Sequence, residues 1–356
     1  MHPRLFGWGA IALLALCSTA SCARLSSKPP TAPGQAETLS KGKLATVLSR
    51  GKLVCGVSGE LPGFSFLGKD GKYQGLDVDI CRAVASAIFD NPQAVEFRNL
   101  NAKERFTALQ SGEVDILSRN TTYTMSRDTS VGLEFAPPVF YDGQGIMVKK
   151  ASGIKSLAEL KGKAICIQTG TTTEQNLTDR MRQRGLNYTP VVFEDLNTTF
   201  ATYSQGRCEG VTGDRSQLVS RRSTLPKPDD HIILPEVLSK EPLAPAIASG
   251  DPAWGDVVRW TIYALIEAEE MKLTAQTVTQ QSTNPDPTVR RLLGLEGDLG
   301  KGLGLPNDFA LRIIKHVGNY GEIYDRNLGA QTPLKLPRGQ NQLWNQGGLL
   351  YSPPFR

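Results

Sequence analysis

A segment near the first third of the chain combines a short apolar run with side chains suited to binding a carboxylate. The run Val114–Leu117 predicts a buried strand. It is followed by hydroxyl, amide and guanidinium groups: Ser118, Arg119, Asn120, Thr121, Thr122, Tyr123, Thr124 and Arg127. Arginine offers a planar fork of donors that matches a carboxylate, and hydroxyl groups can add further hydrogen bonds. The segment therefore indicates an anion site, and a polar loop with an arginine paired to a surface acid is the alternative.

A second polar turn has similar chemistry. Gly170-Thr171-Thr172-Thr173 follows an apolar run at 164–167 and precedes a predicted helix that continues to Arg184. The free N–H groups and the dipole at a helix N-terminus favour an anion, and threonine hydroxyls add donors. No lysine follows the glycine at the spacing of a nucleotide-binding P-loop, so that class is excluded here. An ordinary capped helix is the alternative.

Strands and helices alternate along the chain, and this alternation would position both turns. Predicted strands cover 52–57, 95–98, 114–117, 146–148, 164–167, 191–193 and 208–211, with helices between most of them. This order is typical of parallel, doubly wound sheets, in which ligands lie beyond the carboxyl ends of the strands. The loop Ser58–Phe66 and the segment Ser118–Arg127 should then share one rim. A second rim would contain 168–174 and Asp214.

Length and composition limit the class of protein. The chain has 356 residues, 40% of them hydrophobic and 21% charged, and its formal net charge is +5. This composition suits two globular domains with extensions. No basic run is interleaved with aromatic residues, which argues against a nucleic-acid partner. A helix is predicted from Pro306 to Val317, and the rest of the C-terminal region is expected to be a tail that wraps the surface.

The N-terminus has the pattern of an export signal. Arg4 precedes a short apolar core at 11–16, and small residues follow, so residues 1–23 are predicted to be a signal peptide. Thr19-Ala20-Ser21-Cys22 resembles a bacterial lipoprotein box with Thr in place of Leu, which leaves lipid attachment at Cys22 open. Residues 24–43 are rich in Ser, Pro, Lys and Gly and are predicted to be a flexible tether. No later run reaches the length of a transmembrane helix.

Four cysteines remain after the signal region: Cys55, Cys81, Cys166 and Cys208. An even number in an exported chain indicates two disulfides, and four cysteines allow three connectivities. A zinc site is the rival interpretation, but no two of these cysteines have Cys-x-x-Cys spacing.

Several segments resemble the periplasmic amino-acid-binding proteins of ABC importers (family 3 solute-binding proteins), specifically the general L-amino-acid branch. The segments are GKLVCGVSGELPGFS (51–65), FTALQSGEVDILSRNTTYTMSRDTS (106–130), CIQTGTTTEQNL (166–177), VGNYGEIYDRN (317–327) and GGLLYSPPFR (347–356). The resemblance implies an α/β, two-lobed periplasmic binding protein fold. Each lobe would be a doubly wound sheet with flanking helices, and two crossings would form the hinge. Lobe 1 would contain 44–144 and 243–356, and lobe 2 would contain 145–242.

The resemblance also implies roles for individual residues. Arg127 would bind the α-carboxylate of an amino acid, and Asp214 would bind its α-ammonium group. Further ligand contacts are expected from Asn120, Thr122, Thr171 and Thr172, and an apolar wall from Leu61, Phe64 or Phe66. Ser58 stands where lysine-type binders tend to have an acid, which argues against a strictly cationic ligand. Arg119 would either favour an acidic ligand or point outward and pair with a surface acid.

With the lobes assigned in this way, we expect disulfides Cys55–Cys81 in lobe 1 and Cys166–Cys208 in lobe 2. The implied protein is a periplasmic monomer that captures L-amino acids, broadly but with polar, neutral and acidic ones foremost, and delivers them to an ABC permease. It would need no cofactor or metal. A periplasmic dehydratase on the same fold is the alternative. That chemistry needs a general acid or base in the cleft, and the candidates are His231, His316 and Glu174.

Overall fold

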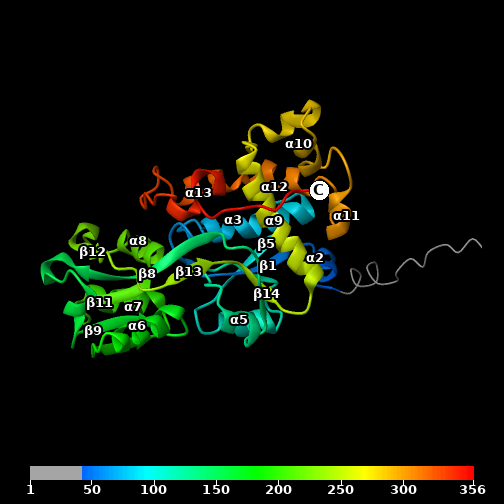
Figure 1. Ribbon diagram of the computed structural model, residues 1–356. Helices are drawn as coiled ribbons and strands as arrows, with labels where there is room; N and C mark the ends of the chain where they lie inside the picture. The colour runs from blue at the N-terminus through cyan, green and yellow to red at the C-terminus, as the bar shows by residue number, and fades with distance from the viewer. Residues whose placement is uncertain (1–41) are drawn as a thin grey trace, which may run out of the picture.

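The computed structural model describes residues 42–356, which form two α/β lobes connected by two strands (Figure 1). The predicted signal peptide, Cys22 and almost all of the predicted tether lie outside the described residues. Within residues 42–356, no helix combines the length and the apolar character needed to cross a membrane. The predicted two-lobed fold is confirmed, whereas the boundaries proposed for the lobes stay a prediction.

The sheet of the first lobe has the spatial order β5–β1–β6–β14–β7. Its strands are β1 (Leu53–Val57), β5 (Val95–Asn99), β6 (Ile116–Leu117), β7 (Leu133–Phe135) and β14 (Ala246–Ala248). Strands β5, β1 and β6 are parallel, as the alternating pattern predicts, but β14 is antiparallel to β6 and to β7. Strand β14 departs from the parallel arrangement because it returns from the second lobe and enters the sheet in the opposite direction.

Helices and a small sheet surround this first sheet. The helices are α2 (Lys43–Arg50), α3 (Leu76–Phe89), α4 (Arg105–Gln110) and α5 (Met125–Thr129), and the small antiparallel sheet contains β2 (Glu60–Leu61), β3 (Ser65–Leu67) and β4 (Tyr73–Gln74). Strand β1 is buried along its whole length, and α3 packs against it. Gly56 leaves room for a neighbouring side chain of the same lobe, because a Cβ there would lie 2.8 Å from the Leu100 side chain.

The sheet of the second lobe has the order β10–β9–β11–β8–β12. Its strands are β8 (Phe140–Lys149), β9 (Ala164–Gln168), β10 (Thr189–Phe193), β11 (Gly210–Asp214) and β12 (His231–Ile233). Helices α6 (Thr172–Gln183), α7 (Leu196–Ser204) and α8 (Arg215–Arg222) pack on it, with short 3-10 turns at Lys150–Ser152, Leu157–Leu160 and Pro228–Asp230. Strands β10, β9 and β11 are parallel, and β8 is antiparallel to β11.

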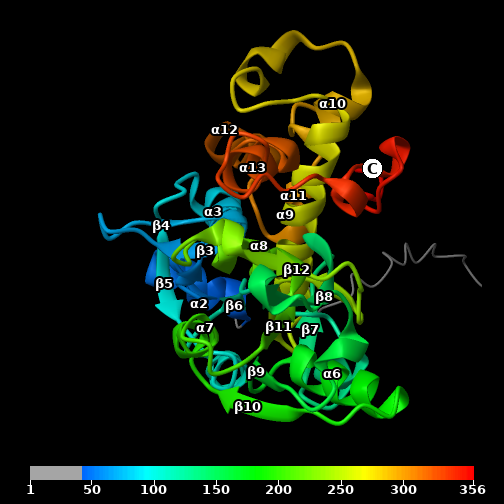
Figure 2. The same cartoon turned by 90° about the vertical axis from the view of Figure 1, so that its left-hand side faces the viewer.

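The C-terminal part of the chain packs on the first lobe. It contains α9 (Pro252–Glu270), α10 (Pro287–Leu292), α11 (Leu299–Leu303), α12 (Phe309–Val317) and α13 (Tyr320–Asn327), with 3-10 turns at Val278–Thr283, Gly339–Asn341 and Trp344–Gln346. Figure 2 shows α12 and α13 beside α3 and α9, which they contact. The predicted surface tail therefore contains an additional helix, α13. Its N-terminus is closed by a capping box between Asn319 and Glu322.

Two antiparallel strands connect the lobes. The start of β8 pairs with β13 (Lys240–Leu243), so that Phe140 lies opposite Leu243 and Asp142 lies opposite Glu241. The C-terminal region forms hydrogen bonds with the first residues of β8. The Asn341 side chain accepts a hydrogen bond from the Tyr141 N–H (2.6 Å) and donates one to its carbonyl (3.2 Å).

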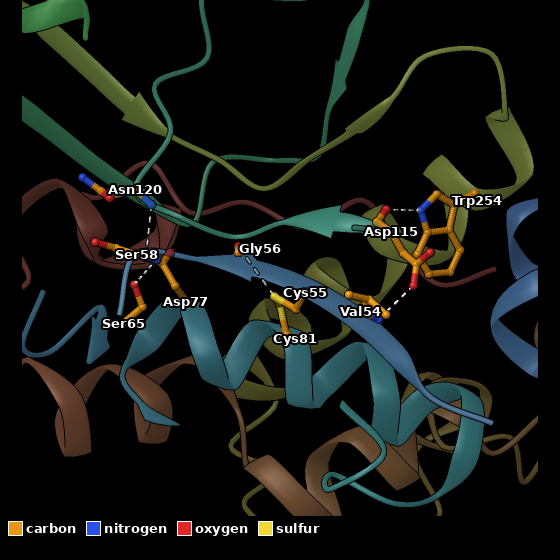
Figure 3. The surroundings of a disulfide bond; sticks show 10 residues. All are labelled: Val54, Cys55, Gly56, Ser58, Ser65, Asp77, Cys81, Asp115, Asn120 and Trp254. Atoms are coloured by element: carbon orange, nitrogen blue, oxygen red, sulfur yellow. Dashed lines mark hydrogen bonds between the residues drawn. A yellow bond between two sulfur atoms is a disulfide. The ribbon is translucent and has the colours of Figure 1, made fainter. Parts of the chain in front are cut away.

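The structure contains both expected disulfides. Cys55–Cys81 joins β1 to α3, as Figure 3 shows, and Cys166–Cys208 joins β9 to the turn before β11. All four cysteines are buried. Each bond therefore ties a strand of the sheet to a neighbouring part of the same lobe.

Candidate functional site

A small polar cavity lies between the lobes at the carboxyl ends of their strands. Its lining residues are Arg105, Arg119, Asn120 and Thr122 from the first lobe, and Gln168, Thr171, Thr172, Thr173, Asp214 and Gln217 from the second. Six of the residues singled out in the sequence are thus brought to one place. The two polar turns, which are about fifty residues apart in the chain, face one another across this cavity.

The first-lobe wall begins directly after β6, where Asn120 has a left-handed backbone. Its φ of 32° is rare for residues other than glycine, although asparagine tolerates it better than most. The Asp77 carboxylate, in the first turn of α3, accepts a hydrogen bond from the Asn120 N–H at 3.0 Å (Figure 3). Burial raises the pKa of Asp77 to about 6, while the Asn120 N–H and Arg119 oppose the rise. Asp77 therefore holds the turn that presents Asn120 to the cavity.

Arg127 lies in α5, which begins after Thr124, and the Thr124 hydroxyl accepts from the Arg127 N–H at 3.3 Å. The Arg127 guanidinium is buried. It donates to the Thr122 carbonyl at 2.8 Å and lies 5.1 Å from the centre of the Phe106 ring. Arg127 does not itself line the cavity but contacts Thr122, which does. Burial lowers the pKa of Arg127, and the charges of Glu241 and Asp214 counter this effect.

Arg119 faces the cavity and does not point outward to a surface acid. It is buried, and its Nε donates to the Leu100 carbonyl at 2.7 Å. Burial lowers the pKa of Arg119 to about 10, with Asp77 and Glu60 acting in the opposite direction. Of the two orientations that the sequence left open for Arg119, the structure has the one that faces the cavity.

Arg105 is a cavity residue that the sequence did not reveal. It begins α4, is 3% exposed, and lies 4.7 Å from the centre of the Phe106 ring. Its two terminal nitrogens make long hydrogen bonds to the Thr121 hydroxyl (3.3 Å) and the Gly170 carbonyl (3.4 Å). Its Nε has no hydrogen-bond partner within residues 42–356. Burial, Arg127 and Arg119 lower the pKa of Arg105, and the charge of Asp214 opposes this decrease only in part.

The second-lobe wall is formed by the N-terminus of α6. Thr171 caps this helix by accepting from the Glu174 N–H at 3.2 Å, as expected for a capped helix. The Glu174 carboxylate accepts from the Gly170 N–H and the Thr169 hydroxyl, both at 3.1 Å. Glu174, the candidate catalytic acid of the enzyme alternative, is thus used to hold the turn.

Asp214 ends β11 and faces the cavity. It occupies the position before α8, yet its side chain makes no capping hydrogen bond there. Burial raises the pKa of Asp214 well above the ordinary value, and the nearby Asp142 and Glu241 raise it further. The Asn120 side chain and Arg105, both from the other lobe, lower it. A cation placed beside Asp214 would stabilise the ionised form of this buried carboxyl group.

Leu61 and Phe64 do not form a wall of the cavity. Both are buried in the core of the first lobe, and the Phe64 ring packs edge to face on Phe140 with 5.2 Å between ring centres. The sequence places them in the correct loop, but the small sheet β2–β3 turns their side chains into the core. Polar groups line the cavity instead.

The histidines named for the enzyme alternative lie elsewhere. His231 bonds to the Tyr203 hydroxyl at 2.8 Å inside the second lobe, and His316 bonds to Asp90 at 2.8 Å on the first. Over the described part of the chain, no cluster of His, Cys, Asp and Glu could hold a metal ion.

Comparisons with known proteins agree with this geometry. Residues 53–280 match the family described as bacterial extracellular solute-binding proteins, family 3. The chain is 53% identical to the general L-amino acid-binding periplasmic protein AapJ of Rhizobium johnstonii, over 90% of this chain and 95% of that protein. It is 49% identical to the glutamate/glutamine/aspartate/asparagine-binding protein BztA of Rhodobacter capsulatus, over 89% and 94%.

A solved structure extends the likeness to the fold. A periplasmic binding protein from Brucella ovis with glutathione bound superposes with a TM-score of 0.86 and 52% identity, covering 88% of this chain and 99% of that one. The two lobes, the polar cavity between them and the match over most of the chain lead to one assignment: this protein belongs to the bacterial extracellular solute-binding proteins of family 3.

Proposed function

We propose that this protein captures an L-amino acid between its lobes in the periplasm and delivers it to the permease of an ABC importer. The observation that carries the proposal is the charge arrangement of the cavity. Buried guanidinium groups stand on the first lobe, and the Asp214 carboxylate faces them from the second. An α-amino acid carries one negative and one positive group a few ångströms apart, so it compensates both walls at once.

The roles follow from the chemistry of each wall. Arg127 binds the α-carboxylate, assisted by Asn120, and Thr122 adds a ligand contact through its hydroxyl oxygen. From the second lobe, the backbone N–H groups of the turn at Thr171 and Thr172, at the start of α6, complete the carboxylate's surroundings, because a helix N-terminus favours an anion. Asp214 binds the α-ammonium group. These assignments agree with the burial of Arg127 and Asp214, because neither charge forms an ion pair with another residue of 42–356.

The ligands we favour have acidic or amide side chains. Arg105 and Arg119 add two more buried cations to the cavity, and a side-chain carboxylate or carbonyl would accept hydrogen bonds from them. The name of the Rhodobacter relative states that it binds glutamate, glutamine, aspartate and asparagine, which supports the same class for this chain. The Rhizobium relative is named for general L-amino acid binding, so neutral ligands belong in the test as well.

Isothermal titration with each L-amino acid, and with glutathione because of the Brucella relative, tests the proposal. Arg127→Ala should abolish binding of every amino acid, since all share the α-carboxylate, and the loss should exceed about 100-fold. Arg98→Ala, which changes an exposed arginine on β5, is the matched control and should bind normally. A loss of less than about tenfold in the Arg127 variant would refute the assigned role.

The three residues that the sequence offered for the dehydratase alternative are engaged in other contacts. Both histidines are engaged away from the cavity, and Glu174 is engaged in the turn before α6. The family is one of transport components that bind solutes without converting them. A monomeric state is part of the proposal. Lipid attachment at Cys22 stays an open alternative, which mass spectrometry of the exported protein would decide.

A further inference from the structure

A buried carboxylate on the connecting strand β13 was not part of the site described so far. Glu241 is completely buried, and its carboxylate accepts hydrogen bonds from four side chains. Thr122 Oγ1 donates at 2.6 Å, Thr172 Oγ1 at 2.8 Å and Asn176 Nδ2 at 2.8 Å, and the Ser239 hydroxyl completes the set. No carboxylate lone pair is left for a weaker partner.

The four donors come from the two lobes and from the segment that connects them, so a change in the angle between the lobes would move some donors away from Glu241. Thr122 belongs to the first lobe, Thr172 and Asn176 to α6 of the second, and Ser239 to the connecting segment itself. The arrangement therefore requires the lobes to be closed. Opening would remove donors from one side of a buried charge, and an incompletely bonded buried carboxylate is costly.

The same contacts orient the hydroxyl groups of two ligand-binding threonines. A carboxylate can only accept, so the hydroxyl protons of Thr122 and Thr172 both point at Glu241. The two oxygens are also 3.3 Å apart, which brings the two lobes into direct contact at this point. Towards the cavity these oxygens offer lone pairs, which suit N–H donors of a ligand better than its carboxylate.

We propose that Glu241 is a positioning residue that couples lobe closure to the arrangement of the ligand-binding hydroxyls. On closure its carboxylate accepts hydrogen bonds from the hydroxyl groups of Thr122 and Thr172. Their protons then point away from the cavity, and their lone pairs remain available to N–H groups of the ligand. The α-carboxylate is then bound by Arg127 and by the backbone N–H groups at the start of α6. The ligand part of this proposal rests on the proposed function, whereas the closure part does not.

Binding kinetics test the ligand part. In stopped-flow measurements with L-glutamate, Glu241→Ala should raise the dissociation rate by about 30-fold and change the association rate by less than about threefold, because the contacts form after encounter. Glu241→Gln keeps the shape and one acceptor and should fall between wild type and Glu241→Ala. Lys240→Gln, an exposed neighbour on the same strand, is the control. Wild-type kinetics in Glu241→Ala would overturn the proposal.

A double-mutant cycle separates positioning from a general loss of packing. Thr172→Val and Glu241→Ala should have non-additive effects on the dissociation rate, since each removes the same hydrogen bond. Additive effects would show that Glu241 acts independently of the threonine and would contradict the proposal. If Glu241→Ala does not fold, the same cycle with Glu241→Gln gives the answer.

The closure part has a readout that needs no ligand. Spin labels at exposed Lys69→Cys and Lys161→Cys, one on each lobe, report the distance between the lobes in the free protein. Glu241→Ala should shift this distribution to longer distances, and an unchanged distribution would refute the coupling. If wild type binds no amino acid, the proposed function fails while this measurement still decides the role of Glu241.

Discussion

Three buried guanidinium groups define the site at the scale of single residues. Arg105 and Arg127 both lie against the Phe106 ring, and Arg119 lies nearby on the same lobe. Burial and mutual repulsion lower the pKa of Arg105, so the empty site carries an electrostatic cost that a bound anion removes. This cost explains why the site should be selective for ligands that bring negative charge or carbonyl oxygens.

Arg105 and Arg119 should set ligand preference. Arg105→Met should weaken binding of glutamate and aspartate by about 30-fold or more, while alanine and serine lose less, because only the acidic ligands bring a second carboxylate. Arg119→Gln should likewise alter preference without abolishing binding. Titration of each variant with acidic and small neutral amino acids gives the ratios. Equal losses for all ligands would assign Arg105 to the common α-carboxylate instead.

Affinity should depend on pH through Asp214. Burial raises the pKa of its carboxyl group in the free protein, whereas an ammonium group beside it favours the ionised form and lowers that pKa. Ligand binding therefore releases a proton, and affinity rises with pH until the carboxyl of the free protein is ionised. Below that point the dissociation constant should change by about tenfold per pH unit. Titrations in buffers of different ionisation enthalpy, at pH 5 and 7.5, measure the proton count, and no proton release would contradict the role.

At the scale of elements, one disulfide in each lobe connects a strand of the sheet to another segment of the same lobe. Cys166–Cys208 spans 42 residues and connects β9, which leads directly into the ligand-binding turn, to the approach of β11, which ends at Asp214. Cys55–Cys81 spans 26 residues and connects β1 to α3, whose first turn contains Asp77. The disulfides therefore stabilise the elements that position the site without touching the cavity.

Removing one disulfide should lower stability more than affinity. In the chain-entropy model, the double variant Cys166→Ala/Cys208→Ala loses about 4 kcal/mol of unfolding free energy, and Cys55→Ala/Cys81→Ala about 3.5 kcal/mol. Chemical denaturation measures these losses. Titration at 25 °C should show an affinity within about tenfold of wild type, because none of these four cysteines lines the cavity. A loss of binding in a variant that stays folded would show that the disulfide controls the site geometry.

At the scale of the whole molecule, the structure shows the lobes closed on the cavity. Contacts away from the cavity cross between them: the Asn197 side chain donates to Glu60 at 2.8 Å, Arg221 donates to the Glu60 carbonyl at 2.8 Å and Ser220 donates to the Pro62 carbonyl at 2.6 Å. On the outside of the hinge, Asn341 and the hydroxyl of Tyr320 bond to the backbone of β8 and the residue before it. The C-terminal region thus braces one end of the connecting strands, so that motion is directed to the second lobe.

Ligand binding should make the molecule more compact. The radius of gyration from small-angle X-ray scattering should fall when L-glutamate is added to wild type, because a ligand that contacts both lobes favours the closed state. Arg127→Ala should show no such change at the same ligand concentration, and Arg98→Ala should respond like wild type. A wild-type radius that is the same with and without bound ligand would contradict closure as the response to binding.

Much of the fold and site could be predicted from local patterns. Apolar runs followed by polar turns placed Asn120, Thr122, Thr171, Thr172 and Asp214 at strand ends, and the structure brings all of them to the cavity. The direction of β14 was not predictable in this way, because parallel and antiparallel strands have the same local sequence pattern. Nor was α13, whose buried face depends on contacts with α3 and α9.

The sequence by itself indicated the alternation of strands and helices and the polar rims, since these depend on neighbours along the chain, whereas the two-lobed class and the pairing of the cysteines were implied by the resemblance to a family. Only the tertiary structure decided that Arg105 and Arg119 face the cavity, that Leu61 and Phe64 face the core, and that Glu241 connects the lobes. Arg105 begins an ordinary short helix, and Glu241 stands in a polar stretch before a proline. Their burial arises from segments far away in the chain, and no local pattern records which distant surface will cover a side chain.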